Sequence, residues 1–185
     1  DGPGRGILSP DEASTLLASP TVDMEVGALR DAPVLVVDGA DQLPVETTAR
    51  LATLPIVSVG IAPAGSALGF DVLVDDAEAA RAVGDGVVAN PMAAVTCCQV
   101  LRHAPWASTD AGLVIESTAF ATLQAGPEFA RWLDGRGRRV RPDEPEPPVL
   151  VDMDGPEVVL TLNRPRLRNA WSAAMRDALV DALRA

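Results

Sequence analysis

Residues 33–61 read PVLVVDGADQLPVETTARLATLPIVSVGI, and this run indicates an α/β fold. Its two apolar ends, 33–37 and 55–61, are typical of parallel strands that are buried on both faces. Residues 45–54 between them have a helix-like composition. A third strand is expected at 70–74 (FDVLV), which extends the pattern into a small sheet with right-handed crossovers.

Helices are predicted both before and after these strands in the sequence. Ser9 and Pro10 suit the N-cap and first position of a short helix, and Asn90 and Pro91 suit the same positions of a later one. The helices that follow the third strand are expected over 77–83, 91–103 and 110–133, the last interrupted at Gly126 and Pro127.

A change of composition after Trp132 predicts a domain boundary. Residues 134–139 (DGRGRR) suggest a flexible basic turn, and 141–148 (RPDEPEPP) are too rich in proline for a helix or a central strand. We therefore expect a small α/β domain over 1–133, an Arg- and Pro-rich linker over 134–148, and the start of a second domain over 149–185.

The second domain begins with the signals of a β-hairpin. Two β-rich runs, 149–153 and 158–162, flank the turn sequence Asp154-Gly155-Pro156. A helix is expected from about Ser172, and the sequence stops inside its pattern, so we expect the rest of this domain to be missing. Such a short sheet needs a further partner, either that remainder or another chain.

Charge and cysteine content narrow the function classes. A net charge of −11 argues against general nucleic-acid binding, although eight of the 15 Arg residues lie between Arg131 and Arg168 and leave room for a local anion site. Cys97 and Cys98 are the only cysteines, and their spacing predicts no metal site and no disulfide framework. They are expected to be small buried hydrophobic residues in a reduced, cytoplasmic protein with no membrane segment.

Residues 158–170 (VVLTLNRPRLRNA) resemble the N-terminal signature of the crotonase (enoyl-CoA hydratase/isomerase) superfamily. In that family a strand ends in Leu-Asn-Arg-Pro, and an Asn-Ala pair three residues later leads into a helix with a Met, here Met175. The resemblance implies crotonase-like ββα elements. Pro165 turns the chain off the strand, and Asn169 is expected to brace that turn by bonding nearby backbone.

The resemblance also implies a ligand. The family residues at the positions of Arg166, Leu167, Arg168 and Ala170 border the nucleotide of coenzyme A, and a guanidinium suits phosphate. The alternative is a pair of solvated surface Arg side chains. Coenzyme A is expected as part of an acyl-CoA thioester substrate, with no tightly bound cofactor, and the family assembles as trimers or hexamers.

The family reaction is typically hydration or isomerisation of an enoyl thioester, with two backbone N–H groups stabilising an enolate. Those donors and the acid/base carboxylates follow later in the family, so no catalytic residue of the second domain is assigned. A non-catalytic scaffold that kept the crotonase shape is the alternative function.

A weaker resemblance covers the first domain, where residues 116–129 and Trp132 are similar to a late crotonase helix. Residues 55–69 occupy the place of its strand and Gly-rich loop, which suggests a degenerate crotonase-like half. The backbone donors in that loop would come from Gly60, Ala64, Gly65 and Ser66, although a plain connection is the simpler interpretation.

Three side chains of the first domain are candidates for acid/base chemistry. Glu116 and Glu128 suit that role if they are buried near a thioester, but surface carboxylates on helices are far commoner. His103 lies at the predicted end of a helix before a proline, where capping explains it better than catalysis.

Overall fold

The computed structural model describes residues 6–67, 69–103, 108–137 and 146–184. Within these ranges the fold is mixed α/β, which confirms the predicted class. The chain divides into two compact units, Asp1–Arg136 and Gly137–Ala185, and each is described by itself. The finer expectation of crotonase-like elements stays a prediction.

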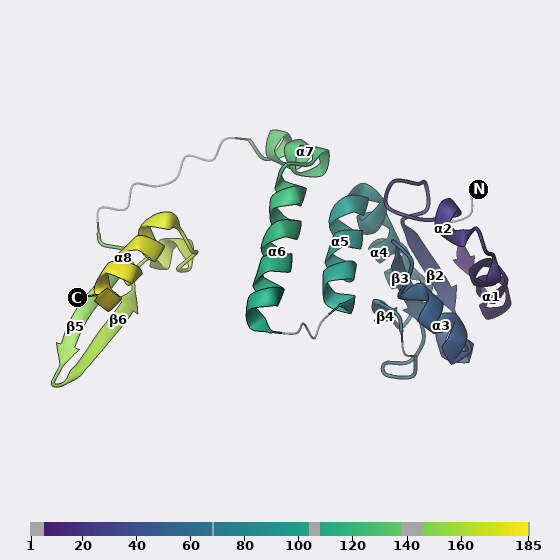
Figure 1. Ribbon diagram of the computed structural model, residues 1–185, viewed down its shortest axis with the longest axis horizontal. Coiled ribbons are helices and arrows are strands. Elements are labelled where there is room, and N and C mark those ends of the chain that lie inside the picture. The colour runs from purple at the N-terminus through teal and green to yellow at the C-terminus, as the bar shows by residue number, and fades with distance from the viewer. Residues whose placement is uncertain (1–5, 68, 104–107, 138–145, 185) are drawn as a thin grey trace. The chain divides into compact units, whose positions relative to one another are not determined.

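A four-stranded parallel sheet forms the centre of the first unit (Figure 1). Its strands lie side by side in chain order: β1 (Ile7–Leu8), β2 (Val34–Asp38), β3 (Val57–Ile61) and β4 (Val72–Val74). All three predicted strands are confirmed. The two-residue β1 is new, because so short a segment carries no readable pattern.

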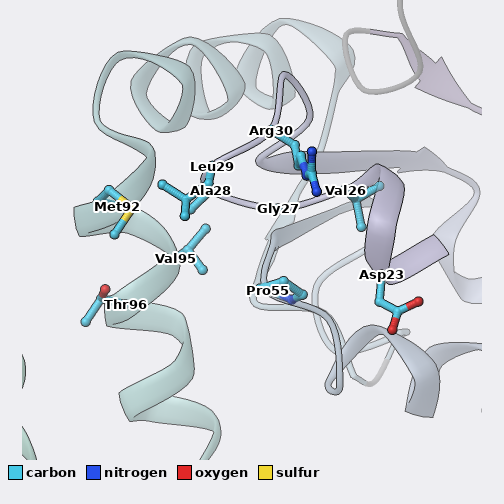
Figure 2. Close-up of a pocket in the computed structure, with 10 residues that line it drawn as sticks. All are labelled: Asp23, Val26, Gly27, Ala28, Leu29, Arg30, Pro55, Met92, Val95 and Thr96. Atoms are coloured by element: carbon cyan, nitrogen blue, oxygen red, sulfur yellow. The ribbon is translucent and has the colours of Figure 1, made fainter. Parts of the chain in front are cut away.

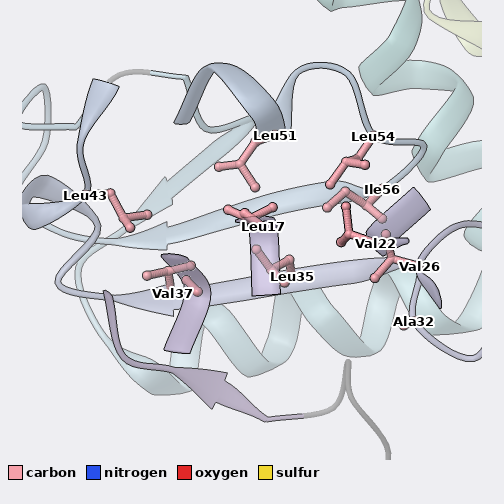
Figure 3. Packing of buried hydrophobic residues seen from close by; sticks show 11 residues of the cluster. Leu17, Val22, Val26, Ala32, Leu35, Val37, Leu43, Leu51, Leu54 and Ile56 are labelled. Atoms are coloured by element: carbon pink, nitrogen blue, oxygen red, sulfur yellow. The ribbon is translucent and has the colours of Figure 1, made fainter. Parts of the chain in front are cut away.

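The helices of the first unit cover both faces of this sheet (Figures 1 and 3). Side chains alternate along a strand, so Leu35 and Val37 of β2 face one layer while Val34 and Val36 face the other. The first layer contains α1 (Pro10–Ala18), α2 (Val22–Glu25) and α3 (Val45–Leu51), and the second contains α4 (Ala77–Ala89) and α5 (Pro91–Arg102).

Two more helices follow in the first unit, α6 (Thr109–Gln124) and α7 (Pro127–Arg136). The predicted interruption at Gly126 and Pro127 is confirmed. The expected basic turn is wrong for residues 134–136, which continue α7, and the guanidinium of Arg136 lies 4.6 Å from the ring centre of Trp132 one turn earlier. Most of the predicted linker, residues 138–145, lies outside the described residues.

The second unit contains the predicted hairpin and helix. Strands β5 (Val149–Asp154) and β6 (Glu157–Leu162) are antiparallel, with Val149 opposite Leu162. Gly155 has a φ of +60°, which the two-residue turn requires and glycine adopts without strain. Helix α8 (Ala173–Arg184) packs against the hairpin and buries Met175 completely.

Much of the hairpin remains exposed to solvent. Val151, Met153 and Val158 share one face, since Val151 is opposite Leu160 and Met153 is opposite Val158, and each of the three is more than half exposed. The expectation that the short sheet needs a further partner stays a prediction. None of the helices in the described ranges has the length and apolar composition that crossing a lipid bilayer requires.

Candidate functional site

The turn that joins β6 to α8 is braced by one asparagine. After β6 the chain forms a single 3₁₀ turn, η2 (Pro165–Leu167), and then Arg168 and Asn169 adopt positive φ values of 51° and 53°. The Asn169 side-chain oxygen accepts a hydrogen bond from the Arg164 N–H at 2.8 Å, and the Asn169 N–H donates to the Arg164 carbonyl at 2.9 Å. The predicted bracing role of Asn169 is therefore confirmed.

The side chain of Arg164 also stabilises this turn. Its side chain is buried, with 8% of the residue exposed, and its Nη1 donates to the Ala170 carbonyl at 2.6 Å. No role for the Arg164 side chain was predicted from the sequence. This hydrogen bond joins the two ends of the turn and helps to hold the backbone of residues 164–170.

The four predicted ligand residues lie together on this turn. Arg166, Arg168 and Ala170 are exposed, and Leu167 is half-buried. Within the described residues, neither the Arg166 nor the Arg168 side chain makes a hydrogen bond or ion pair. The neighbouring Arg164, by contrast, is buried. Two uncommitted guanidinium groups on a braced turn can bind a multivalent anion such as a phosphate group.

Glu128 in α7 has a structural role at the start of α5. Its two carboxylate oxygens accept hydrogen bonds from the backbone N–H groups of Met92 and Ala93, at 2.8 and 2.9 Å. The predicted N-cap residue, Asn90, is in the right position but makes no side-chain capping bond. Glu128 thus satisfies the first turn of α5 from a distant part of the chain, and Glu116 is simply exposed on α6.

Substituting Glu128 with Ala is expected to lower the free energy of unfolding by about 1–2 kcal/mol, because two N–H groups and the positive end of the helix dipole lose their carboxylate. Urea unfolding followed by circular dichroism measures this. Glu116→Ala is the matched control and should change the free energy of unfolding by less than about 0.5 kcal/mol. Equal effects of the two substitutions would contradict the capping role.

Two of the four candidate backbone donors in the first unit are already used within the fold. Gly60 lies inside β3, paired in register with Val37 on one side and Leu73 on the other. The Ser66 N–H donates to the Pro63 carbonyl at 3.0 Å. Ala64 and Gly65 lie on the same exposed turn. The sheet and the turn therefore use two of the four candidates, which favours a connecting loop.

His103 occupies the C-cap of α5, as predicted, and its backbone N–H donates to the Gln99 carbonyl at 3.3 Å. The expectation of two buried cysteines is wrong for Cys97, which is exposed, whereas Cys98 is half-buried. Adjacent residues of a helix point about 100° apart, so only one of the pair faces the sheet. Both thiols are free.

A buried ion pair was not predicted from the sequence. Asp71 precedes β4, and its Oδ1 accepts a hydrogen bond from Arg102 Nε at 2.8 Å. Its Oδ2 accepts from the N–H and the hydroxyl of Ser58, at 2.7 and 2.8 Å. Arg102 also donates to the carbonyls of Leu54 and Ile56, at 2.8 and 2.9 Å. The side chains of Arg102 and Asp71 are only 11% and 9% exposed, so this network ties α5 to β3 and β4.

The network shifts two ionisation equilibria. Burial alone would raise the pKa of Asp71, but the hydrogen bonds from Arg102 and Ser58 outweigh it, and the pKa lies below its ordinary value. Burial, with the nearby Asp71 carboxylate, raises the pKa of the Cys98 thiol to about 11. Cys98 is therefore a neutral thiol at physiological pH and a poor nucleophile.

The lowered pKa of Asp71 predicts a pH dependence. The folded-state pKa lies below the unfolded one, so the contribution to stability is complete above the unfolded pKa and is lost as the pH falls through the folded one. Comparing the parent protein with Asp71→Asn by urea unfolding, we expect the difference in free energy to shrink as the pH falls from about 7 to about 3. A difference that grows with acidity would have the wrong sign.

A second polar feature lies at the carboxyl ends of the strands. Asp38, Asp41 and Asp75 line an open cavity of about 460 Å³ beside Ile61 and Pro63. This edge of a parallel sheet is where α/β proteins commonly bind ligands. Among the described residues, however, no group of three or more His, Cys, Asp or Glu side chains is placed to hold a metal ion.

Comparison of the chain with models of protein families, with curated proteins and with solved structures gives no match. The function is therefore inferred from the residues and their geometry.

Proposed function

We propose that this chain is part of an acyl-CoA-processing protein of the crotonase type, and that residues 163–170 bind the phosphates of coenzyme A. The observation that supports this most directly is the placement of Arg166 and Arg168. Both are exposed and uncommitted on a turn held by Asn169 and the buried Arg164.

The physical basis is preorganisation. A flexible arginine-rich loop loses backbone entropy when it binds an anion, whereas this turn is already closed by hydrogen bonds at 2.8 and 2.9 Å. A protein with a net charge of −11 repels polyphosphates in general, so a local pair of guanidinium groups determines where such a ligand docks. Charge-assisted hydrogen bonds between arginine and phosphate are among the stronger polar contacts in proteins.

The reaction in this proposal is the one that the resemblance to crotonases implies. Hydration or isomerisation of an enoyl thioester would proceed through an enolate held by two backbone N–H groups. We assign no catalytic residue to this chain. Coenzyme A would enter as part of the substrate, and the exposed hairpin would be covered by the remainder of a crotonase domain or by other copies in a trimer or hexamer.

Isothermal titration of the protein with coenzyme A tests the proposal. Arg166→Glu/Arg168→Glu should weaken binding at least about tenfold, since two attractive groups become repulsive. Arg81→Glu/Arg184→Glu makes the same change in net charge at two exposed helix positions and should leave the affinity nearly unchanged. Pantetheine, which lacks the phosphates, should bind equally to all three proteins.

Equal binding of coenzyme A by both double variants would remove the two arginines from the site. A complete lack of coenzyme A binding by the parent protein would overturn the proposal.

A non-catalytic scaffold is the second candidate function. The commitment of Gly60 to β3 and of the Ser66 N–H to its own turn supports it, because neither is then available to an enolate. On this alternative the protein would bind coenzyme A without converting an enoyl-CoA, a result that a spectrophotometric assay of the enoyl thioester would reveal.

A further inference from the structure

An apolar cleft of about 350 Å³ lies between α5 and the chain that leads into β2 (Figure 2). Val26, Ala28 and Pro55 line one side, and Met92 and Val95 of α5 line the other. Its volume falls at the small end of the range in which proteins bind organic ligands. The cleft lies beside residues 92–96 and 26–30 of the first unit, whereas the proposed phosphate turn belongs to the second unit.

A short, well-formed turn builds the mouth of this cleft. The Gly27 N–H donates to the Ala32 carbonyl at 2.9 Å, and the Arg30 N–H donates to the Gly27 carbonyl at 3.0 Å. Gly27 has a φ of +143°, and a Cβ there would lie 3.3 Å from Pro55 Cγ, so glycine lets the turn approach Pro55 closely. The turn thereby presents Leu29 and Arg30 at its tip.

One cation, Arg30, and one anion, Asp23, line the cleft. Arg30 is exposed, and within the described residues its side chain makes no ion pair or hydrogen bond. Asp23 also lines the cleft, but it extends away from Arg30 (Figure 2). Glu128 already satisfies the N-terminal N–H groups of α5, so Arg30 is the cation that a ligand in this cleft would meet.

The apolar residues that line the cleft, including Leu29, indicate that part of the ligand is a hydrocarbon. Leu29 is 86% exposed although it lines the cleft. A bound hydrocarbon would cover Leu29 together with Val95 and Met92, and removing apolar surface from water is favourable. An inorganic anion would use none of these side chains.

We propose that this cleft binds a small apolar monocarboxylate, with the hydrocarbon against Val26, Pro55 and Val95 and the carboxylate on Arg30. This site is separate from the proposed coenzyme A turn and does not depend on it. A neutral or cationic molecule of the same length lacks the contact with the guanidinium and binds more weakly.

Hexanoate, hexan-1-ol and hexylamine test the proposal as probes of one length and three head groups. Each probe is titrated into the protein, and the shifts of the backbone amide signals are followed in two-dimensional NMR spectra. We expect hexanoate to shift the amides of residues 26–30 and 92–96, with a dissociation constant of about 1 mM, as suits so small a ligand. Hexanol should bind about tenfold more weakly, and hexylamine should not saturate.

Two substitutions separate the contributions of the head group and the walls. Arg30→Gln, at an exposed position that should not affect folding, is expected to weaken hexanoate binding about tenfold and to leave hexanol unchanged. Ala28→Phe should fill the cleft and abolish both. Arg166→Glu/Arg168→Glu should bind hexanoate like the parent protein, which separates this site from the coenzyme A turn.

The proposal is overturned if hexanoate and hexylamine shift the same amides with equal affinity, or if Arg30→Gln binds hexanoate like the parent protein. Shifts confined to residues outside the cleft would also overturn it.

Discussion

Arg102→Met is expected to lower the free energy of unfolding of the first unit by about 3–5 kcal/mol, because it leaves the Asp71 carboxylate buried without its cation. The side chain of Asp71 is 9% exposed, so water cannot replace the guanidinium well. The substitution also removes the donors to the Leu54 and Ile56 carbonyls. Urea unfolding followed by circular dichroism measures the loss.

Two comparisons test the cause of that loss. The double variant Arg102→Met/Asp71→Asn should be less destabilised than the sum of its single variants, since it leaves no unpaired charge. Arg176→Met breaks an exposed pair with Asp177, whose side chains are 58% and 61% exposed, and should cost less than about 1 kcal/mol. A strictly additive double variant would mean that Arg102 acts through packing and not through the buried charge.

Gly60→Val is expected to destabilise the first unit by about 3 kcal/mol or more, and Gly60→Ala by about 1–3 kcal/mol, because the centre of the sheet has no room for a side chain. A Cβ at Gly60 would lie 2.7 Å from the Ala40 Cβ and 2.8 Å from Leu73 Cδ2. Leu73 can rotate its tip, but the Ala40 Cβ moves only with its backbone. Thermal and urea unfolding both report the change.

Gly86→Ala is the matched control for Gly60. Gly86 lies in α4, where an added Cβ meets nothing within 4 Å, so alanine should stabilise the helix by about 0.5–1 kcal/mol. Opposite signs for the two glycine substitutions are the expected result. If Gly60→Ala were neutral, the close packing of β3 against residues 40 and 73 would be refuted.

Local features of the fold could be predicted from the sequence because their causes are local. Ser9 is the N-cap of α1, as predicted, and its N–H donates to Glu12 at 2.8 Å within a capping box. Gly155 permits the hairpin turn, and Pro127 begins a helix. Each depends on residues within about four positions of one another, the distance over which propensity and capping act.

The candidate site was predictable only in part. The residues of the turn after β6 are close in sequence, so the bracing role of Asn169 followed from its short polar side chain, which can bond nearby backbone. The role of Arg164 did not, because its burial and its bond to the Ala170 carbonyl appear only in the folded turn. An arginine in a polar stretch ordinarily suggests solvent exposure.

The tertiary structure determined which charged side chains form ion pairs or hydrogen bonds with distant residues. Asp71 and Arg102 are 31 residues apart, and Glu128 lies 36 residues from Met92, so no sequence pattern joins them. Asp71 and Arg102 meet because α5 packs against the sheet, and Glu128 reaches Met92 because α7 lies beside the start of α5.

The sequence by itself determined the α/β class, strands β2 to β6, the starts of most helices and the turn that carries Arg166 and Arg168. The fold alone determined that Glu128 caps a helix, that Cys97 faces solvent and that Arg30 borders an apolar cleft. The physical reason is range: backbone preferences act between neighbours in the chain, whereas desolvation and ion pairing depend on neighbours in space.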